Sequence, residues 1–417
     1  MGFYFESEDI MNDQPNEAVL EVKDVFKIFG PSPGKAKKLL GEGKTKQEIL
    51  KETGNTVAVN NVSFTVNRGE TFVVMGLSGS GKSTLIRCLN RLHDPSYGEV
   101  KVEGKDVVKL SEDDLRMVRR EKMGMVFQHF GLFPHRTIRR NVDYGLEIQG
   151  VPEEERIQRA YEALELVGLK GYEEMKPGEL SGGMQQRVGL ARALVLDPDI
   201  LLMDEAFSAL DPLIKKNMQD ELISLQEKVH KTIIFITHDL DEALKLGDRI
   251  AVMYEGEIVQ IGTPEEILTN PANDYVRDFV ENVDRSKVLT AESIMRKPVA
   301  VVSSTAGPKA AVRRMEKEGI SSIFVVDGKH QLRGIVDIED AQKLADEGVK
   351  DLDSAITTDF QTTTPDTVVV DLLPKASRAK NPIAVVDESN KLLGIIVRVS
   401  VITGISRETV KVGEAHA

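Results

Sequence analysis

A glycine-rich run after an apolar stretch of this 417-residue chain has the composition and spacing of a phosphate-binding loop. The run consists of Gly76, Leu77, Ser78, Gly79, Ser80, Gly81, Lys82, Ser83 and Thr84. It follows a strand-like segment at 71–75 and opens a helix-like one, so it matches G-x-x-x-x-G-K-S/T in the required context. Its glycines let backbone N–H groups turn toward phosphate oxygens, and a helix N-terminus adds partial positive charge. We expect Lys82 to reach the β- and γ-phosphates of a nucleotide and Ser83 to hold Mg²⁺.

Two further strand-like segments end in side chains that suit phosphate chemistry. Asp204 and Glu205 follow the apolar run 200–203, and His238 ends another apolar strand. A carboxylate at the end of a buried strand can hold Mg²⁺, and the next carboxylate can polarise an attacking water. We assign these two roles to Asp204 and Glu205, and we expect His238 to reach the γ-phosphate. The alternatives are an ordinary strand-end acidic pair and a structural histidine.

Residues 180–187, which read Leu-Ser-Gly-Gly-Met-Gln-Gln-Arg, resemble the signature sequence of ABC-type ATPases. The motifs around them agree with this resemblance. Gln128 resembles the Q-loop glutamine, residues 208–211 resemble the D-loop, and His238 matches the switch histidine. Together these motifs cover about the first 270 residues in the expected order. The chain is therefore similar to ABC ATPases over most of its length.

The resemblance implies a homodimer that sandwiches two ATP molecules head to tail. The residues implied to contact ATP bound by the other copy are Ser181, Gly182, Gly183, Gln185 and Asp211. Gln128 is implied to contact Mg²⁺ or water and to sense a membrane partner. Phe29 is the candidate for stacking on adenine, with Phe26 as the competing position and a core aromatic as the alternative. Closure with nucleotide and reopening after hydrolysis would convert chemistry into movement.

Alternating strand-like and helix-like stretches from about residue 20 to 267 must position these residues. Short runs rich in Val, Ile and Leu predict a parallel sheet buried under helices. Residues 136–196 are polar and helix-like, which predicts a helical subdomain inserted in this α/β core. The lysine-rich segment 34–54 interrupts two strand-like stretches, and we interpret it as a solvated surface helix. We expect the ATPase domain to occupy residues 1–270.

An internal repeat follows a linker at 271–286. The segment that begins at Ile323 returns 60 positions later at Ile383, each time as strand, turn and strand after a helical stretch. The repeat predicts two small α/β units packed as a pseudo-symmetric pair. We place them at 287–345 and 346–405, with a tail at 406–417. They resemble a tandem of CBS modules.

Composition excludes several classes of protein. A net charge of −13 argues against a dedicated nucleic-acid-binding protein, which needs a concentrated basic surface. The single cysteine, Cys88, excludes an internal disulfide and fits a reducing compartment. No stretch approaches the roughly 20 apolar residues that span a bilayer, and the acidic start lacks the features of a secretory signal. We therefore expect a peripheral protein rather than an integral one.

The residues in and around the motifs resemble, more specifically, those of the ATPase subunits of glycine betaine/proline importers of the OpuA type. The lysine-rich segment, residues 204–213 and residues 270–276 carry this likeness. It implies import of a compatible solute through separate membrane permease subunits, with a substrate-binding protein or domain, at the cytoplasmic face of a bacterial membrane. The alternatives are an importer ATPase for another small solute and a soluble ABC ATPase that acts on nucleic acid.

CBS pairs commonly hold adenosine-containing ligands, including AMP, ATP or cyclic di-AMP. The residues expected to line such a site are Val301, Ser321, Asp337, Asp340 and Pro382. In the first copy Asp337 occupies the hydroxyl position of the usual ribose-binding pattern, and the second copy, at 394–400, lacks both hydroxyl and carboxylate. Two equivalent AMP sites are therefore not expected, and a structural dimerisation module is the alternative.

Ionic-strength sensing is a second hypothesis for the repeat. Basic residues lie on the two repeat helices or just beyond them, at Arg313, Arg314, Lys317, Lys375, Arg378 and Lys380. Facing a bilayer, they would bind anionic lipid at about 1 kcal/mol per charge. Salt screens such contacts over about 8 Å, so rising ionic strength would release them. The alternative is an ordinary solvated helix face.

Overall fold

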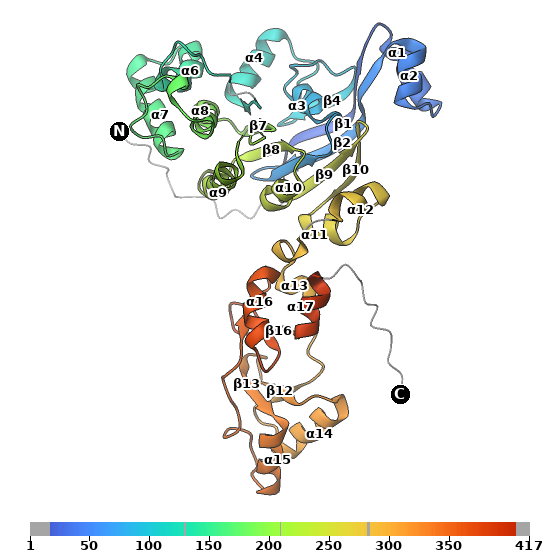
Figure 1. Ribbon diagram of the computed structural model, residues 1–417, viewed down its shortest axis with the longest axis vertical. Coiled ribbons are helices and arrows are strands. Elements are labelled where there is room, and N and C mark those ends of the chain that lie inside the picture. Colours follow the sequence, from blue (N-terminus) through green and yellow to red (C-terminus); the bar gives the residue numbers. More distant parts are fainter. Residues whose placement is uncertain (1–16, 129–130, 209, 282–283, 406–417) are drawn as a thin grey trace. The chain divides into compact units, whose positions relative to one another are not determined.

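The computed structural model describes residues 17–128, 131–208, 210–281 and 284–405. The chain divides into two compact units, Met1–Asn282 and Val283–Ala417 (Figure 1). The division falls inside the stretch 271–286 that we expected as a linker, and the expected tail at 406–417 lies outside the described residues. No helix within the described ranges has the length and apolar character needed to cross a membrane.

The first unit is built around a six-stranded sheet in the order β10-β9-β3-β8-β7-β6. The strands are β3 (Thr71–Met75), β6 (Met123–Val126), β7 (Ile200–Asp204), β8 (Thr232–Thr237), β9 (Arg249–Tyr254) and β10 (Glu257–Gly262). Neighbouring strands are parallel except β10, which runs antiparallel to β9. Every residue of β3, β7 and β8 is buried. The predicted parallel sheet with two buried faces is confirmed.

A four-stranded antiparallel sheet in the order β2-β1-β4-β5 packs beside it. Its strands are β1 (Ala18–Phe29), β2 (Thr56–Asn67), β4 (Tyr97–Val102) and β5 (Lys105–Asp106). Helix α3 (Lys82–Leu89) packs against strands of both sheets. The rings of Phe64 and Phe72, one from each sheet, stack with centroids 4.9 Å apart. This shared core fixes α3, and with it the glycine-rich run that precedes α3.

Helices make up the predicted subdomain at 136–196. They are α5 (Ile138–Val142), α6 (Tyr144–Gln149), α7 (Glu153–Leu166), the 3₁₀ turn η1 (Pro177–Glu179) and α8 (Gly182–Leu194). Helix α7 packs on α8, which buries Ala160 and Leu164. The remaining helices of the first unit are α4 (Glu112–Glu121), α9 (Pro212–Val229), α10 (Leu240–Leu246), α11 (Pro264–Thr269) and α12 (Asp274–Val280).

The lysine-rich segment forms two helices, α1 (Pro33–Gly41) and α2 (Lys46–Thr53), rather than one solvated helix. Ile49 is fully buried with Leu39 against the β1–β2 pair, so the insertion has a small core of its own. The side chain of Lys46 approaches the β9–β10 turn at Gly256. Burial lowers the pKa of Lys46, and the nearby acidic residues of that turn oppose this shift. The insertion is thus docked on the turn.

The second unit contains two copies of one small α/β motif. The first copy has β11 (Val301–Ser303), α14 (Pro308–Glu318), β12 (Ser322–Val326), β13 (Leu332–Asp337) and α15 (Ile338–Asp346). The second has β14 (Thr362–Thr363), α16 (Val369–Arg378), β15 (Ile383–Val386), β16 (Leu392–Ile396) and α17 (Arg398–Ile405), and η2 (Arg285–Lys287) and α13 (Ala291–Ile294) precede the first copy. In each sheet one parallel pair is followed by an antiparallel hairpin.

Reciprocal backbone hydrogen bonds join the two copies. The amide of Arg296, before the first copy, donates to Ile395 O of the second at 2.9 Å, and the Ile395 amide returns the bond. Thr357, before the second copy, exchanges the same pair of bonds with Ile335 of the first at 3.0 and 2.9 Å. Each copy therefore lends a backbone segment to the edge of the other sheet. Neither sheet is complete alone.

We predict that Gly334→Ala weakens the backbone hydrogen bonds between Ile335 and Thr357 that join the two copies. A Cβ at Gly334 would lie 2.3 Å from Ile356 Cγ2 and 2.7 Å from Thr357 O, so the lent segment must move. Overpacking of this kind costs about 1–3 kcal/mol of unfolding free energy. Urea unfolding with hydrogen exchange of the β13 amides would measure the loss. Gly328→Ala is the matched control, because a Cβ there meets nothing within 4 Å. Equal protection of β13 in both variants would contradict the prediction.

Candidate functional site

The glycine-rich run forms a tight loop between β3 and α3. Gly76 has a φ of +156°, and a Cβ there would lie 2.1 Å from Met253 O, so only glycine fits. The loop is also held from outside, because the Gly256 amide donates to Ser80 O at 2.8 Å. Helix α3 begins at Lys82, directly after the loop. Backbone N–H groups of this loop and helix start are suited to bind an anion.

Lys82 lies at the bottom of the loop with 3% of its surface exposed. Its Nζ donates to Gly76 O at 2.8 Å and to Leu77 O at 3.1 Å. Burial lowers the pKa of Lys82, while the charges of Glu205 and Asp204 oppose that shift. The ammonium is therefore held among acceptors at the place where phosphates would bind.

Asp204 ends β7 beside the loop, and its side chain is suited to a hard cation. Its Oδ1 atom is buried and makes no hydrogen bond within the described chain, while Oδ2 accepts from Arg87 at 3.4 Å. Carboxylate oxygens are the ligands that Mg²⁺ prefers. The orphaned Oδ1 therefore fits the predicted magnesium role. Ser83 on α3 and Gln128 after β6 are the other residues that would hold the ion.

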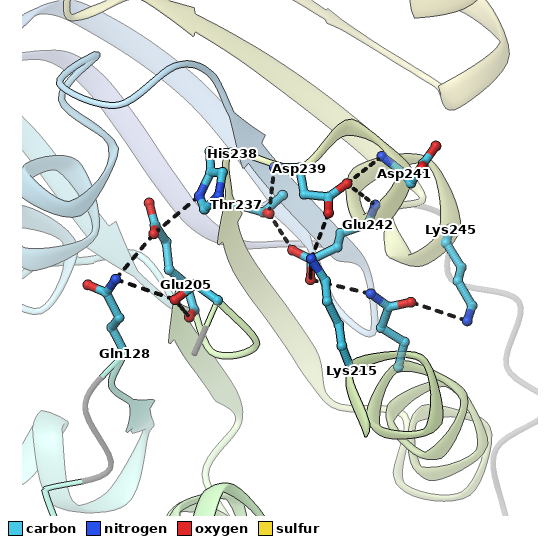
Figure 2. Close-up of polar contacts among 11 residues, drawn as sticks. Gln128, Glu205, Lys215, Thr237, His238, Asp239, Asp241, Glu242 and Lys245 are labelled. Atoms are coloured by element: carbon cyan, nitrogen blue, oxygen red, sulfur yellow. Dashed lines mark hydrogen bonds and ion pairs between the residues drawn. The ribbon is translucent and has the colours of Figure 1, made fainter. Parts of the chain in front are cut away.

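Glu205 brings the remaining predicted residues together (Figure 2). Its Oε2 atom lies 3.3 Å from His238 Nδ1 and accepts a hydrogen bond from Gln128 Nε2 at 3.4 Å. Its Oε1 atom lies 3.9 Å from Lys82 Nζ. Glu205 has a φ of +47°, a conformation that is costly for a residue with a Cβ. Such strain at a carboxylate is common where a side chain must be aimed at a reaction centre.

The signature residues lie on another part of the first unit. Ser181 caps α8 by accepting from the Met184 amide at 3.3 Å, and Asp211 caps α9 by accepting from two amides. Within the described chain, no hydrogen bond or ion pair joins Ser181 or Asp211 to the glycine-rich loop. The same holds for Gly182, Gly183 and Gln185. The role of these residues toward ATP bound by another copy stays a prediction from the resemblance.

The two candidates for adenine stacking differ in their surroundings. Phe29 ends β1 with 38% of its surface exposed, and the edge of its ring meets His93 at 5.6 Å between centroids. Phe26 packs against Tyr97, and Lys37 Nζ lies 4.7 Å from its ring centroid. Phe29 is the more exposed of the two, although Lys27 Nζ lies 4.8 Å from its ring centroid, whereas Phe26 is half-buried beside the insertion. The geometry favours Phe29 for stacking.

Several contacts at this site have no counterpart in the predicted motifs. Tyr275 on α12 packs against Tyr254, with ring centroids 4.2 Å apart and the ring planes tilted by 39°. Its hydroxyl is buried, which raises the pKa of Tyr275, and the Leu77 backbone N–H of the glycine-rich loop opposes this shift. Arg87, which contacts Asp204, was also missed. Its only sequence signal is its position on α3 five residues after Lys82.

Three of the proposed ligand residues of the second unit, Ser321, Asp337 and Asp340, lie at or near the start of α15. Burial, together with the charges of Asp340 and Glu339, raises the pKa of Asp337, and Lys380 from the second copy opposes this. The Ile338 amide donates to Ser321 O at 2.8 Å, so the ends of β12 and β13 meet here. Val301 pairs with Phe324 on β12. Pro382, before β15, is half-buried.

The start of the corresponding helix in the second copy carries an arginine that bonds to backbone carbonyls. Arg398 at the start of α17 donates to the carbonyls of Ala376, Ser377 and Ala379 at 2.9–3.0 Å. The basic residues considered for lipid binding do not share one helix face. Helices α14 and α16 lie at opposite ends of the second unit (Figure 1).

Comparisons with known proteins agree with this geometry. The model of the ABC transporter family matches residues 59–208, and the CBS domain model matches residues 291–346. The glycine betaine/carnitine transport ATP-binding protein GbuA of Listeria monocytogenes is 55% identical over 94% of this chain and 99% of that protein. The glycine betaine transport ATP-binding protein OpuAA of Bacillus subtilis is 57% identical over 91% of this chain and 90% of that protein.

A third relative is the glycine betaine/proline betaine transport ATP-binding protein ProV of Salmonella typhimurium, 47% identical over 93% of this chain and 98% of that protein. The chain belongs to the ABC transporter ATP-binding proteins. These three relatives are glycine betaine transport ATP-binding proteins, and the expected resemblance is confirmed. This ABC ATPase is an enzyme whose ATP hydrolysis is coupled to transport.

Solved structures support the fold of the ATPase unit. The dimeric structure of MJ0796, a bacterial ABC transporter cassette, is 33% identical to this ABC ATPase with a TM-score of 0.50. The match covers 59% of this chain and 98% of the MJ0796 chain. A second structure of MJ0796 is a dimer in a post-hydrolysis state bound to ADP and phosphate, with the same identity and coverage. The α/β ATPase core followed by a CBS domain is thus confirmed.

We predict that Phe29→Ala weakens ATP binding about 10-fold, because stacking of a base on an aromatic ring is worth about 1–3 kcal/mol. Equilibrium binding of a fluorescent ATP analogue to the full chain would measure the loss. Phe26→Ala is the matched control and should bind within about twofold of the parent. A larger loss for Phe26→Ala would assign the stacking role to Phe26 instead.

Proposed function

We propose that this chain powers the import of a compatible solute of the glycine betaine class through separate membrane permease subunits. The observation that carries the proposal is the position of Glu205, which contacts Gln128, His238 and Lys82 in a chain closely related to betaine transport proteins. A substrate-binding protein or domain would deliver the solute. The chain would act at the cytoplasmic face of a bacterial membrane as a peripheral subunit.

In this proposal each residue around the glycine-rich loop has one task. Lys82 and the loop amides, from Gly76 to Thr84, hold the β- and γ-phosphates of ATP. Glu205 accepts a hydrogen bond from the attacking water and orients it toward the γ-phosphate. His238 and Gln128 fix the Glu205 carboxylate and reach the same phosphate. A bound Mg²⁺, held by Ser83, Gln128 and Asp204, neutralises charge on the phosphates.

The second half-site would act on ATP held by another copy. Ser181, Gly182, Gly183 and Gln185 form or flank a helix start that offers backbone N–H groups to the γ-phosphate. Asp211 would join the two sites across the dimer. Because the two halves lie apart within one chain, hydrolysis requires closure of a head-to-tail pair, and product release reopens it. The dimeric form of the MJ0796 cassette supports this arrangement.

We further propose that the CBS pair regulates the ATPase, through an adenine nucleotide such as cyclic di-AMP and through ionic strength. One copy carries the carboxylates Asp337 and Asp340 at the start of α15, whereas the other carries Arg398, bonded to backbone carbonyls, at the start of α17. The asymmetry favours one ligand for each pair over two equivalent AMP molecules. Anionic lipid could contact the basic helix α14 or α16, and the two helices would then bind separately.

We predict that Glu205→Gln retains ATP binding and lowers the rate of ATP hydrolysis at least about 100-fold, because the amide cannot act as a base. Phosphate release and nucleotide affinity, measured on the full chain with its permease subunits in proteoliposomes, would check both parts. Betaine uptake should fall with the hydrolysis rate. Glu21→Gln, an exposed change on β1, is the control. Near-normal hydrolysis in Glu205→Gln would remove Glu205 from the role of base.

We predict that cyclic di-AMP binds the full chain with micromolar or tighter affinity and that Asp337→Ala weakens this binding about 10-fold or more. The reason is the loss of a charged hydrogen-bond acceptor, which is worth about 1.5–3 kcal/mol. Calorimetric titration suits the chain because it contains no tryptophan. Asp353→Ala, an exposed change between the copies, is the control. Absence of heat at low and high salt would leave lipid-linked ionic sensing as the regulatory proposal.

A further inference from the structure

A buried carboxylate lies behind the switch histidine and belongs to none of the motifs. Glu242 is on α10, four residues after His238, with 3% of its surface exposed. Its Oε2 atom accepts a hydrogen bond from the Thr237 hydroxyl. Its Oε1 atom lies 3.0 Å from Lys215 Nζ and accepts from Gln219 Nε2 at 3.3 Å. A buried charge this well partnered has a defined orientation.

Lys215 connects this carboxylate to a second element (Figure 2). It lies on α9, one helical turn after Asp211, and its Nζ is 2.6 Å from Asp239 Oδ2 as well as 3.0 Å from Glu242 Oε1. Burial lowers the pKa of Lys215, but hydrogen bonds to the two carboxylates outweigh it and the pKa is raised. One ammonium thus ties the start of α9 to the start of α10.

The residues on both sides of His238 are fixed by this cluster, whereas His238 itself is open. Thr237 donates to Glu242 and accepts from the Asp239 amide at 3.0 Å. Asp239 is held by Lys215. The His238 side chain is 53% exposed and contacts Glu205 at 3.3 Å. Its position is therefore set by the backbone at Thr237 and Asp239 and not by packing around its ring.

We propose that Lys215 and Glu242 are positioning residues for ATP hydrolysis, which hold His238 in reach of Glu205 and link it to the Asp211 end of α9. The proposal rests on the function proposed above for Glu205 and His238. Neither residue touches the reacting atoms. A movement of α9 on closure of the dimer would be transmitted through Lys215 to the two residues that flank the histidine.

The test compares kcat, KM for ATP and thermal unfolding of full-length variants in assembled transporter. Lys215→Met and Thr237→Val should lower kcat about 10- to 100-fold with KM changed less than about threefold, because a small misplacement of a catalytic group has effects of this size. Lys215→Arg, which keeps the ion pairs, and Thr237→Ser, which keeps the hydroxyl, should restore kcat to within about threefold of the parent. Thr237→Val conserves volume, so it reports on the hydroxyl even where Glu242→Gln fails to fold.

Lys245→Met is the matched control. Lys245 also lies on α10 and bridges to α9, at 2.6 Å from Asp220 and 3.2 Å from Gln219, but it contacts neither neighbour of His238. An equal loss of kcat in Lys245→Met and Lys215→Met would overturn the proposal, since general packing of α9 on α10 would explain both. So would an unchanged kcat in Lys215→Met and Thr237→Val.

The variant His238→Ala distinguishes failure of the positioning role from failure of the role proposed for His238. Loss of hydrolysis in His238→Ala with full kcat in Lys215→Met overturns the positioning role alone. Full hydrolysis in His238→Ala overturns the role proposed for His238 and, with it, the need for positioning. A double variant, Lys215→Met with Glu242→Gln, should lose no more than the worse single variant, because contacting residues in one network act as a unit.

Discussion

The register of three central strands is the constraint on which the site depends. Strand β3 pairs with β8 so that Met75 faces Thr237, and β7 pairs with β8 so that Asp204 faces Ile236. The phosphate loop, the two carboxylates and the histidine follow these residues directly, so they meet at one edge of the sheet. A slip of one residue would turn every side chain of a strand to its opposite face. Burial of all three strands on both faces prevents that slip.

Patterns among residues close in sequence were sufficient to predict the buried strands, the phosphate loop and the repeated unit. Buried strands appear as apolar runs, the loop before Lys82 as glycine spacing, and the second unit as a repeat. The lysine-rich segment shows where such patterns fail. Its charges predicted a solvated helix, but Ile49 is fully buried because Leu39 of the insertion and the flanking strands β1 and β2 supply an apolar surface for it. Tertiary contact overrode the average polarity of the segment.

The sequence also did not reveal several contacts between residues that lie far apart along the chain. Lys215 meets Asp239 across 24 positions, and Arg87 meets Asp204 across 117. Neither pair has a local spacing that marks it, and Lys215, Asp239 and Arg87 each read alone as an ordinary surface charge. The exchange of segments at Arg296 and Thr357 is likewise invisible in the repeat, because it joins one copy to the other. Motifs identified the groups expected to contact phosphate, whereas the residues that contact and support those groups required coordinates.

The contact of Tyr275 with the phosphate loop bears on how this protein can be divided and recombined. Helix α12 follows the last sequence motif of the ATPase, yet its tyrosine packs against Tyr254, and the Leu77 amide of the loop lies near enough to oppose the raised pKa of Tyr275. A shortened chain that stops at residue 270 would lack this tyrosine beside the loop, although the catalytic motifs would be present. Hybrid transporters that exchange their C-terminal modules should therefore be joined after Glu281. The end of the ATPase is set by what supports the phosphate loop and not by the last residue that touches ATP.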